Sequence, residues 1–503
     1  MDGLDIASLI QPQTPINIDV LETELSSHPD REYVATLING LRYGFDTGIS
    51  PLPQVSSEYK NLASARNNQD FVLEQLKKEI SKGFLIGPFK KPPFDIYRIN
   101  PIGVATRKFS KKQRLIVDCS WPHAEFPDSE LNYDTVSINS LISKEEYSLK
   151  YVKIDDAINI IKDLGPGCKL TKTDICDAFK LIPIKSDLVK YYGIKFHDRY
   201  FFFTKLVFGG RSSPKIFNIL SEAIVYIAQS NYGIPVVLHI LDDFLAIDPP
   251  FSDAERSLAI LTLIFNRLNI PWHPVKTMGP LCALTWLGLE IDTEAGEIRL
   301  DAEKLSQIDY VITKYYNRKY CTKRELLSVL GHLTFAARGA RLGRSFTSRI
   351  LQAAYSKPDL NDWIKMTSDV LADLNMWKDI LRQWNGTSFI CQEPDLETSE
   401  VLVTDASGSL GFGGFYFKTN KWFQSEWPSN MIVPNEKKLS ICFQEIYPIV
   451  VACLLFGEGW KRKSIVFLCD NSAAVLILNK GRSKCPLIMK LIRRLVIMAT
   501  VKG

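Results

Sequence analysis

Two adjacent aspartates, Asp242 and Asp243, lie between two short apolar runs at residues 236–241 and 244–247. These runs are rich in β-branched and aromatic residues, a pattern that predicts two buried strands joined by a tight turn. Two carboxylates at such a junction are costly to bury unless a cation compensates their charge. A divalent metal ion bound by oxygen ligands provides that compensation. On this stretch alone, a solvated Asp-Asp turn is the alternative.

The charged residues are unevenly distributed along the 503-residue chain, whose net charge is +5. Residues 1–60 are acidic and contain several prolines, so we expect a loosely structured lead-in. Basic side chains concentrate in residues 76–120, 311–350 and 461–503, which hold eleven, nine and ten Lys or Arg. A single basic tract is explained by a solvated face, but three favour nucleic acid as the partner.

The cysteines and apolar runs exclude several other classes of protein. The ten cysteines are scattered singly, and no histidine follows His332, so a Cys/His zinc cluster in the last third is excluded. The first residues lack the pattern of a signal peptide, and the longest apolar run, Ile446–Phe456, is too short to cross a bilayer. We therefore expect reduced thiols, no membrane partner and an intracellular location in the cytoplasm or nucleus.

Three further stretches carry candidate chemistry. Residues 100–118 alternate like a β-hairpin with strands near 102–106 and 114–117, and Arg114 fixed on a strand suits bidentate phosphate contact. An exposed hairpin kept soluble by its lysines is the alternative. A strand ends at Asp174, where a sheet can present a metal ligand at its edge. A glycine-rich loop at residues 208–213 leads into a helix with Pro214 in its first turn.

Taken in order, these motifs resemble the fingers and palm of reverse transcriptases over residues 100–290. The hairpin ending in Arg-Leu-Ile-Val-Asp resembles the fingers, and residues 173–179 (Thr-Asp-Ile-Cys-Asp-Ala-Phe) resemble the first catalytic motif. Residues 208–217 resemble the template- and nucleotide-contacting motif, and Leu-Asp-Asp-Phe at 241–244 the second catalytic motif. Residues 268–276 and 284–290 resemble the lysine-bearing motif and the primer-grip hairpin. Ile240 departs from the family, in which an aromatic residue is often found there.

The resemblance implies an RNA-directed DNA polymerase that extends a DNA primer on an RNA template with deoxynucleoside triphosphates. Two Mg²⁺ ions, or Mn²⁺, would be held by Asp174, Asp242 and Asp243 with the Ile175 carbonyl. Phe179 would exclude a ribose 2′-hydroxyl, although in isolation it could be an ordinary core aromatic. The implied nucleotide-binding residues are Lys108, Arg114, Ile175, Asp177, Ala178, Phe179, Phe208, Gly209 and Lys276, and the implied primer- or template-contacting residues are Arg211, Ser213, Pro214, Leu287 and Gly288.

After Ile291 the pattern becomes helical. Thr322 and Glu325 form a capping box before an apolar run, and a further helix is predicted near residues 361–384. Arginines at 338, 341, 344 and 349 follow at near-helical spacings, which resembles a thumb and connection that track duplex phosphates. We expect a domain boundary near residues 390–398.

In the last hundred residues, Asp405 ends a strand, Glu445 lies in a helical run and Asp470 ends another strand. Each acid alone could be a surface residue or a helix cap. Together they resemble the catalytic, metal-binding carboxylates of ribonuclease H, which cleaves the RNA strand of an RNA–DNA hybrid with two metals. Members of that family generally have a fourth carboxylate, and no Asp or Glu follows Asp470. We therefore expect an incomplete domain with little or no cleavage.

The expected fold class is α+β, a right-hand polymerase of fingers, palm and thumb followed by a partial ribonuclease H-like α/β domain. The predicted divisions are residues 1–60, 61–295, 296–395 and 396–503. Residues 404–407, 328–333 and 241–244 look most similar to DIRS-type retrotransposons, although related retroelements and pararetroviruses share most of these motifs. The alternative function is a decayed or co-opted element that binds nucleic acid without catalysis. The sequence predicts no oligomeric state.

Overall fold

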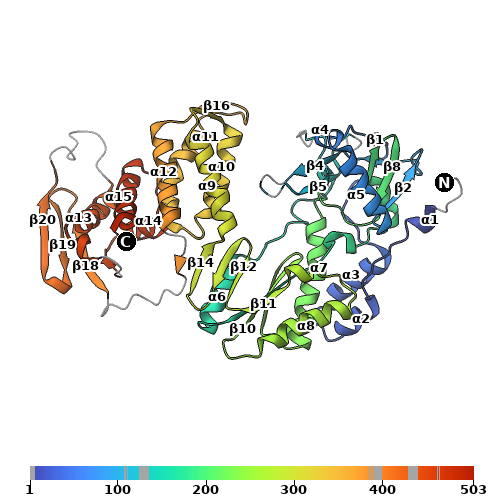
Figure 1. The fold of residues 1–503 in the computed structure, drawn as a ribbon, viewed down its shortest axis with the longest axis horizontal. Coiled ribbons are helices and arrows are strands. Elements are labelled where there is room, and N and C mark those ends of the chain that lie inside the picture. The colour runs from blue at the N-terminus through green and yellow to red at the C-terminus, as the bar shows by residue number, and fades with distance from the viewer. Residues whose placement is uncertain are drawn as a thin grey trace. The chain divides into compact units, whose positions relative to one another are not determined.

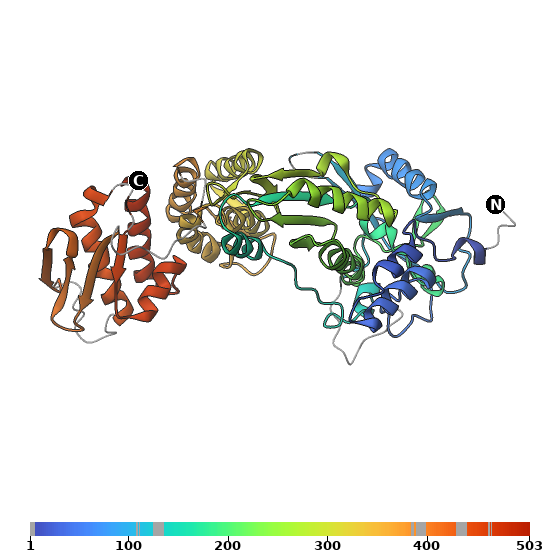
Figure 2. The ribbon, with the colours of Figure 1, turned by 90° about the horizontal axis from the view of Figure 1, so that it is seen from below.

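The computed structural model describes residues 6–106, 109, 111–123, 135–383, 387–388, 399–428, 440–460, 463 and 465–502 (Figure 1, Figure 2). The chain divides into two compact units, residues 1–284 and 285–503. Each unit combines helices with mixed or antiparallel sheets.

Unit 1 is built on two sheets and a hairpin. The first sheet has the order β1-β3-β7-β8-β2, with β1 Ser57–Glu58, β2 Leu85–Phe89, β3 Arg98–Ile99, β7 Gly193–Phe196 and β8 Arg199–Phe203. The second has the order β11-β6-β10-β9, with β6 Lys169–Asp174, β9 Val236–Ile240, β10 Asp243–Asp248 and β11 Met278–Leu281. The hairpin pairs β4 (Ile102–Thr106) with β5 (Gln113–Val117), which confirms the hairpin predicted from alternation. Strand β6 lies between β10 and β11, so Asp174 ends a central strand.

Helices cover these sheets. They are α1 Ile6–Leu9, α2 Ile18–Glu24, α3 Arg31–Tyr43, α4 Ala63–Arg66, α5 Gln69–Ser81, α6 Ile154–Leu164, α7 Ser213–Tyr226 and α8 Ala254–Arg267. Helix α8 contacts β6, β10 and β11, and α7 contacts β9. Short 3₁₀ or π turns are η2 Ile138–Leu141, η3 Ala178–Leu181, η4 Ser186–Tyr191, η5 Ile227–Asn231 and η6 Pro274–Lys276. Helices α5 and α7 begin close to their predicted positions.

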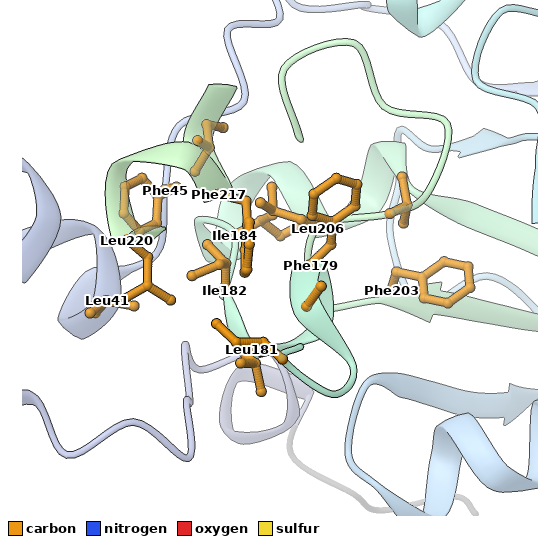
Figure 3. Close-up of a cluster of buried hydrophobic side chains, with 14 of the residues drawn as sticks. Leu41, Phe45, Phe179, Leu181, Ile182, Ile184, Phe203, Leu206, Phe217 and Leu220 are labelled. Atoms are coloured by element: carbon orange, nitrogen blue, oxygen red, sulfur yellow. The ribbon is translucent and has the colours of Figure 1, made fainter. Parts of the chain in front are cut away.

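The segment before residue 60 differs from the loosely structured lead-in expected from its prolines and acidity. Asp30 caps α3 by accepting a hydrogen bond from Tyr33 N at 2.9 Å. Leu41 and Phe45 belong to the same buried cluster as Phe217 and Leu220 of α7, all labelled in Figure 3. Asp19, Glu22 and Glu32 are exposed on α2 and α3, whereas the apolar side of these helices is buried.

The first part of unit 2 is a small sheet followed by helices. The sheet has the order β12-β13-β14-β17, with β12 Ala283–Trp286, which crosses the division between units, β13 Leu289–Asp292, β14 Glu297–Leu300 and β17 Thr387–Ser388. The helices are α9 Ala302–Tyr316, α10 Lys323–Ala336, α11 Ser348–Ala354 and α12 Ser368–Gln383, with η7 at Arg341–Phe346. The Thr322–Glu325 capping box is present as predicted. The helix expected at 361–384 is shorter, because Trp363–Lys365 forms strand β16 against β15 (Tyr320–Thr322).

The second part of unit 2 is a mixed sheet covered by helices. Its order is β20-β19-β18-β21, with β18 Glu400–Ala406, β19 Gly411–Tyr416, β20 Lys421–Glu426 and β21 Ile465–Leu468. Strand β21 runs parallel to β18, and the other neighbouring pairs are antiparallel. Helix α13 (Ile441–Phe456) packs on β18 and β19, with α14 (Ser472–Lys480) and α15 (Pro486–Lys502) against it. Short turns are η8 Phe417–Thr419 and η9 Gly457–Trp460. The domain boundary predicted near 390–398 lies outside the described residues.

Two buried ionic clusters stabilise unit 2. Glu400 accepts hydrogen bonds from Tyr416 and Lys418 and pairs with Lys463 at 2.7 Å. Burial alone would raise the pKa of Glu400, but these donors outweigh it and lower the pKa to about 2. In the other cluster, the Arg493 guanidinium on α15 lies 3.2 Å from Asp373 of α12.

Helix α13 with its η9 extension, residues 441–460, is long and apolar enough to cross a membrane by length and composition. Half of its most apolar window is buried inside the protein, and Gln444 and Glu445 on it are buried. The helix is therefore longer than the apolar run 446–456 suggested, and we interpret it as the core helix of its sheet.

Candidate active sites

The first candidate site lies where strand β6 ends and the β9–β10 turn begins. Asp174 is the last residue of β6, and it pairs directly across the sheet with Asp243, the first residue of β10. Asp242 lies in the turn, and its carbonyl accepts a hydrogen bond from Ile175 N at 2.9 Å. Because the N–H and C=O of an extended residue point to the same side, the Ile175 carbonyl faces the turn as well. The fold therefore brings the predicted ligands to one sheet edge.

The turn is constrained by the helix behind it. Leu241 has a φ of 54°, a left-handed conformation that is uncommon for a branched residue. Ser221 Oγ, fully buried on α7, donates to the Leu241 carbonyl at 2.9 Å. Ile240, the departure noted in the sequence, ends β9 opposite Asp243 and is half-buried. The position of the Asp242 and Asp243 side chains is thus fixed by strand pairing and by α7.

The carboxylates disfavour one another's charge. Burial is the main cause that raises the pKa of Asp242, and the charge of Asp174 adds to it. Burial also raises the pKa of Asp243 to about 6. The charge of Lys172 lowers this pKa, and the charges of Asp174 and Asp242 raise it. Lys172 Nζ lies 3.6 Å from Asp243 Oδ2, and Lys276 Nζ lies 2.8 Å from Asp174 Oδ1. Two lysines therefore offset part of a concentrated negative charge.

One oxygen of this site is well suited to a cation. Among the described residues, Asp243 Oδ1 is buried and has no hydrogen-bond partner. A buried carboxylate oxygen without a donor is costly, and a bound cation removes that cost. Carboxylate and backbone carbonyl oxygens are the ligands that Mg²⁺ uses in proteins. Asp174, Asp242, Asp243 and the Ile175 carbonyl thus fit a divalent ion.

The predicted nucleotide-binding residues are distributed around this edge. Arg114 is exposed on β5, and its charge lowers the pKa of Asp242, so its guanidinium lies within electrostatic reach of the carboxylates. Asp177 has a φ of 58° and is paired with Lys82, whereas Ala178 is buried in η3. Lys108 lies outside the described residues.

Phe179 is a core residue that borders an exposed ring. Its side chain is 7% exposed, and its ring centroid lies 4.8 Å from Phe208 and 5.6 Å from Phe217. Phe208 is 49% exposed. The core packing fixes the direction of the Phe179 ring, and Phe208 is the part of this aromatic group that solvent reaches.

The glycine-rich loop is held by a residue that the sequence did not single out. Gly209 has a φ of 117°, and a Cβ there would lie 2.2 Å from the Val117 carbonyl oxygen, so only glycine fits. Asn139 Nδ2 donates to the Gly209 carbonyl, and Asn139 Oδ1 accepts from Arg211 N, each at 2.8 Å. The Arg211 guanidinium donates to the Ile142 carbonyl at 2.7 Å. Asn139 therefore sets the shape of the loop.

The remaining predicted primer and template residues lie in different settings. Ser213 is buried and its Oγ donates to the Val207 carbonyl at 2.9 Å, while Pro214 lies in the first turn of α7. In unit 2, Leu287 and Gly288 form the turn between β12 and β13, with φ angles of 51° and 77°. The Ser213 hydroxyl is thus used by a hydrogen bond inside the protein. The Leu287–Gly288 turn is a tight hairpin, as predicted.

The second candidate site lies on the mixed sheet of unit 2. Asp405 is on β18, Glu445 on α13 and Asp470 directly after β21. Burial raises the pKa of Glu445 to about 7, and the charges of Asp470 and Asp405 contribute in that order. Among the described residues, no Lys or Arg forms an ion pair with these three acids. The structure brings Glu445 and Asp470 within ligand distance of each other, and the charge of Asp405 reaches Glu445. Carboxylates in such a group suit a divalent cation.

A thiol joins this second cluster. Cys469 Sγ donates to Glu445 Oε2 at 3.9 Å, and ligand atoms of Cys469, Glu445 and Asp470 lie within 4.8 Å of one another. Burial is the main cause that raises the pKa of the Cys469 thiol, and the carboxylates add to it. A cavity of 630 Å³ opens beside Asp405, lined by residues of β19 and β20 that include Trp422. Over the described residues 472–502, no carboxylate joins the site.

The fold of this chain is similar to that of solved reverse transcriptase structures. A similar solved structure is the foamy viral protease-reverse transcriptase dRH in complex with double-stranded DNA, at 14% identity and a TM-score of 0.51, over 99% of this chain and 82% of that chain. The foamy viral protease-reverse transcriptase in complex with RNA/DNA hybrid matches at 15% identity and a TM-score of 0.50, over 95% of this chain and 62% of that chain. No family model matches the chain, and no curated protein does. At these identities the likeness shows the fold alone.

Proposed function

We propose that this chain is an RNA-directed DNA polymerase of a retroelement that extends a DNA primer with deoxynucleoside triphosphates. The observation that carries the proposal is the group of carboxylates at the β6 end and the β9–β10 turn, with Asp243 Oδ1 buried and unpaired. The foamy viral structures are complexes with double-stranded DNA and with RNA/DNA hybrid, which supports nucleic acid as the partner here.

The residues of the site have distinct roles in this proposal. Asp174 and Asp242 would hold two Mg²⁺ ions with the Ile175 carbonyl, and Asp243 would support them. When bound, these ions supply activation of the primer 3′-hydroxyl and neutralisation of the triphosphate. Arg114 orients the triphosphate by charge-assisted hydrogen bonds, with Lys108 as its partner on the same hairpin. Lys276 forms an ion pair with Asp174 in this structure. In the proposal it leaves Asp174 and contacts the incoming nucleotide.

The domain assignment is part of the proposal. Residues 61–295 are the fingers and palm, 296–395 the thumb and connection, and 396–503 a ribonuclease H-like domain. The stretches at 241–244, 328–333 and 404–407 favour an element of the DIRS type, acting in the cytoplasm or nucleus.

The second site is proposed to act on RNA–DNA hybrids with low efficiency. Asp405, Glu445 and Asp470 provide three metal-binding carboxylates, which supports a hybrid-cleaving function. We assign polymerisation as the main activity, because the polymerase site contains the buried, unpaired oxygen Asp243 Oδ1.

The experiment is primer extension on matched RNA and DNA templates with Mg²⁺. Wild-type protein extends the primer on RNA, chelation of the metal stops extension, and Asp242→Asn loses it while keeping its melting temperature, because the substitution removes a buried charge. Asp163→Asn, on the exposed face of α6, is the matched control and stays active. Extension by Asp242→Asn at the wild-type rate overturns the metal assignment. Hybrid binding without extension by the wild type would instead support the non-catalytic alternative.

A further inference from the structure

A cavity of 470 Å³ in unit 2 concentrates positive charge. Four cationic side chains line it, together with two hydroxyl groups: Arg338, Arg344, Lys480 and Arg482, with Thr334 and Thr347. No carboxylate lines this cavity, which we call the basic pocket. In the described part of the chain, none of the four cations forms an ion pair. Four unpaired like charges around one small space repel one another, and an anion relieves that repulsion.

The pocket is assembled from two parts of unit 2 that are distant in sequence. Arg338 follows α10 and Arg344 lies in η7, whereas Lys480 ends α14 and Arg482 follows it. Basic residues of two separate tracts thus converge on one cavity. Convergence of this kind indicates a binding site, since a solvated basic face has no need of a concave surface.

Hydrogen bonds join the two segments that line the basic pocket. Ser345 Oγ donates to the Gly481 carbonyl at 2.8 Å. Arg493 Nε donates to the Ser345 carbonyl at 3.1 Å, and Arg493 Nη2 donates to Ser348 Oγ at 2.8 Å. Ser345 is 1% exposed and Arg493 is 8% exposed, so these bonds are shielded from water. The pocket is therefore preorganised, and a ligand need not bring its walls together.

The composition of the pocket selects phosphate. Three of its four cations are arginines, whose planar guanidinium forms two parallel hydrogen bonds to a phosphate. The Thr334 hydroxyl adds a neutral donor, whereas the Thr347 hydroxyl donates to the Arg344 carbonyl at 2.8 Å. A volume of 470 Å³ is too small for a duplex, but it holds two or three linked phosphate groups. We propose that the basic pocket binds adjacent phosphate groups, which either a nucleic-acid strand or a free polyphosphate supplies.

Binding measurements on the full chain separate these two sources. The probes are inorganic tripolyphosphate, followed by calorimetry, and a fluorescent single-stranded oligonucleotide, followed by anisotropy over a range of salt concentrations. The test variant is Arg344→Gln/Arg482→Gln, with one substitution on each wall, and Arg338→Gln/Lys480→Gln repeats the test with the other two cations. The control is Lys365→Gln/Lys421→Gln, which removes the same charge from exposed positions outside the pocket.

For a free polyphosphate, tripolyphosphate binds the wild type and the control, and each pocket variant weakens it by about tenfold or more. For a strand, the slope of log affinity against log salt falls by about 1.4 in each pocket variant, because two phosphate contacts at about 0.7 each are lost. Either result supports the site. The proposal is overturned if tripolyphosphate does not bind the wild type and the salt slope is the same in pocket and control variants. None of these readouts requires polymerase or nuclease activity, so failure of the proposed function leaves the test intact.

Discussion

Replacing Asn139 with alanine tests whether the glycine-rich loop is held by this one side chain. Asn139 is 6% exposed and makes hydrogen bonds at 2.8 Å to Ser120 Oγ, the Gly209 carbonyl and Arg211 N. At about 1 kcal/mol for each lost bond, Asn139→Ala costs about 3 kcal/mol of unfolding free energy. For a unit of this size, that loss lowers the melting temperature by about 6–12 °C.

The same substitution has a functional consequence. Without Asn139, binding of template and nucleotide must also order the glycine-rich loop. If ordering the loop costs about 1.4 kcal/mol of binding free energy, KM rises about tenfold. Steady-state primer extension at a temperature well below the transition measures this effect separately from unfolding.

Asn100→Ala is the matched control. Asn100 is 2% exposed and donates to the Tyr191 and Gly193 carbonyls at 3.0 and 3.2 Å, away from the loop. We expect a comparable loss of stability but an unchanged KM. If both variants raise KM equally, or if Asn139→Ala changes neither quantity, the loop is not held in the way described.

Three further predictions concern other residues. Phe179→Val is expected to raise ribonucleotide incorporation relative to deoxynucleotides, because a smaller side chain no longer collides with a 2′-hydroxyl; an unchanged ratio in single-nucleotide extension removes that role. Hybrid cleavage by the full chain is expected to be slow and to be abolished by Glu445→Gln, and a rate unaffected by this change would assign the cleavage to other residues. Glu400, whose pKa is lowered from 4.5 to about 2, contributes stability above pH 4.5 that is lost as the pH falls towards 2. Acid unfolding followed by circular dichroism should therefore be steeper over this range in the wild type than in Glu400→Gln, and identical curves would contradict the assignment.

Local patterns in the sequence predicted local structure well. The alternation around Arg114 gave the β4–β5 hairpin, and Thr322 with Glu325 marked the start of α10. The apolar runs on either side of Asp242 and Asp243 became β9 and β10. These features depend on residues within a few positions of one another, so periodicity and capping rules suffice to find them. The catalytic roles of the aspartates stay a prediction.

Long-range contacts were the part that the sequence could not provide. Asn139 bonds to a loop 70 residues away, and no local pattern distinguishes it from an ordinary polar turn residue. Cys469 has no local pattern that sets it apart from the other thiols, and only the fold places Glu445 on α13 beside it. The helices before residue 60 did have a signal, since Val34, Leu37, Ile38 and Leu41 follow helical spacing. The prolines and acidic residues of this segment nevertheless predict a loose structure, which the helical spacing contradicts.

The burial of α3 has a consequence for how the chain is made. Thr14 bonds to the Leu181 carbonyl and Asn269 to the Pro15 carbonyl, across separations of 167 and 254 residues. A ribosome adding about 5–20 residues per second needs roughly 8–33 seconds to reach the first of these partners. During that interval α3 can pack against α2 but not against the later elements of its buried cluster. Closing such long loops slows folding further. The native contacts of this N-terminal segment therefore form only after partners 167 and 254 residues further along the chain have been made.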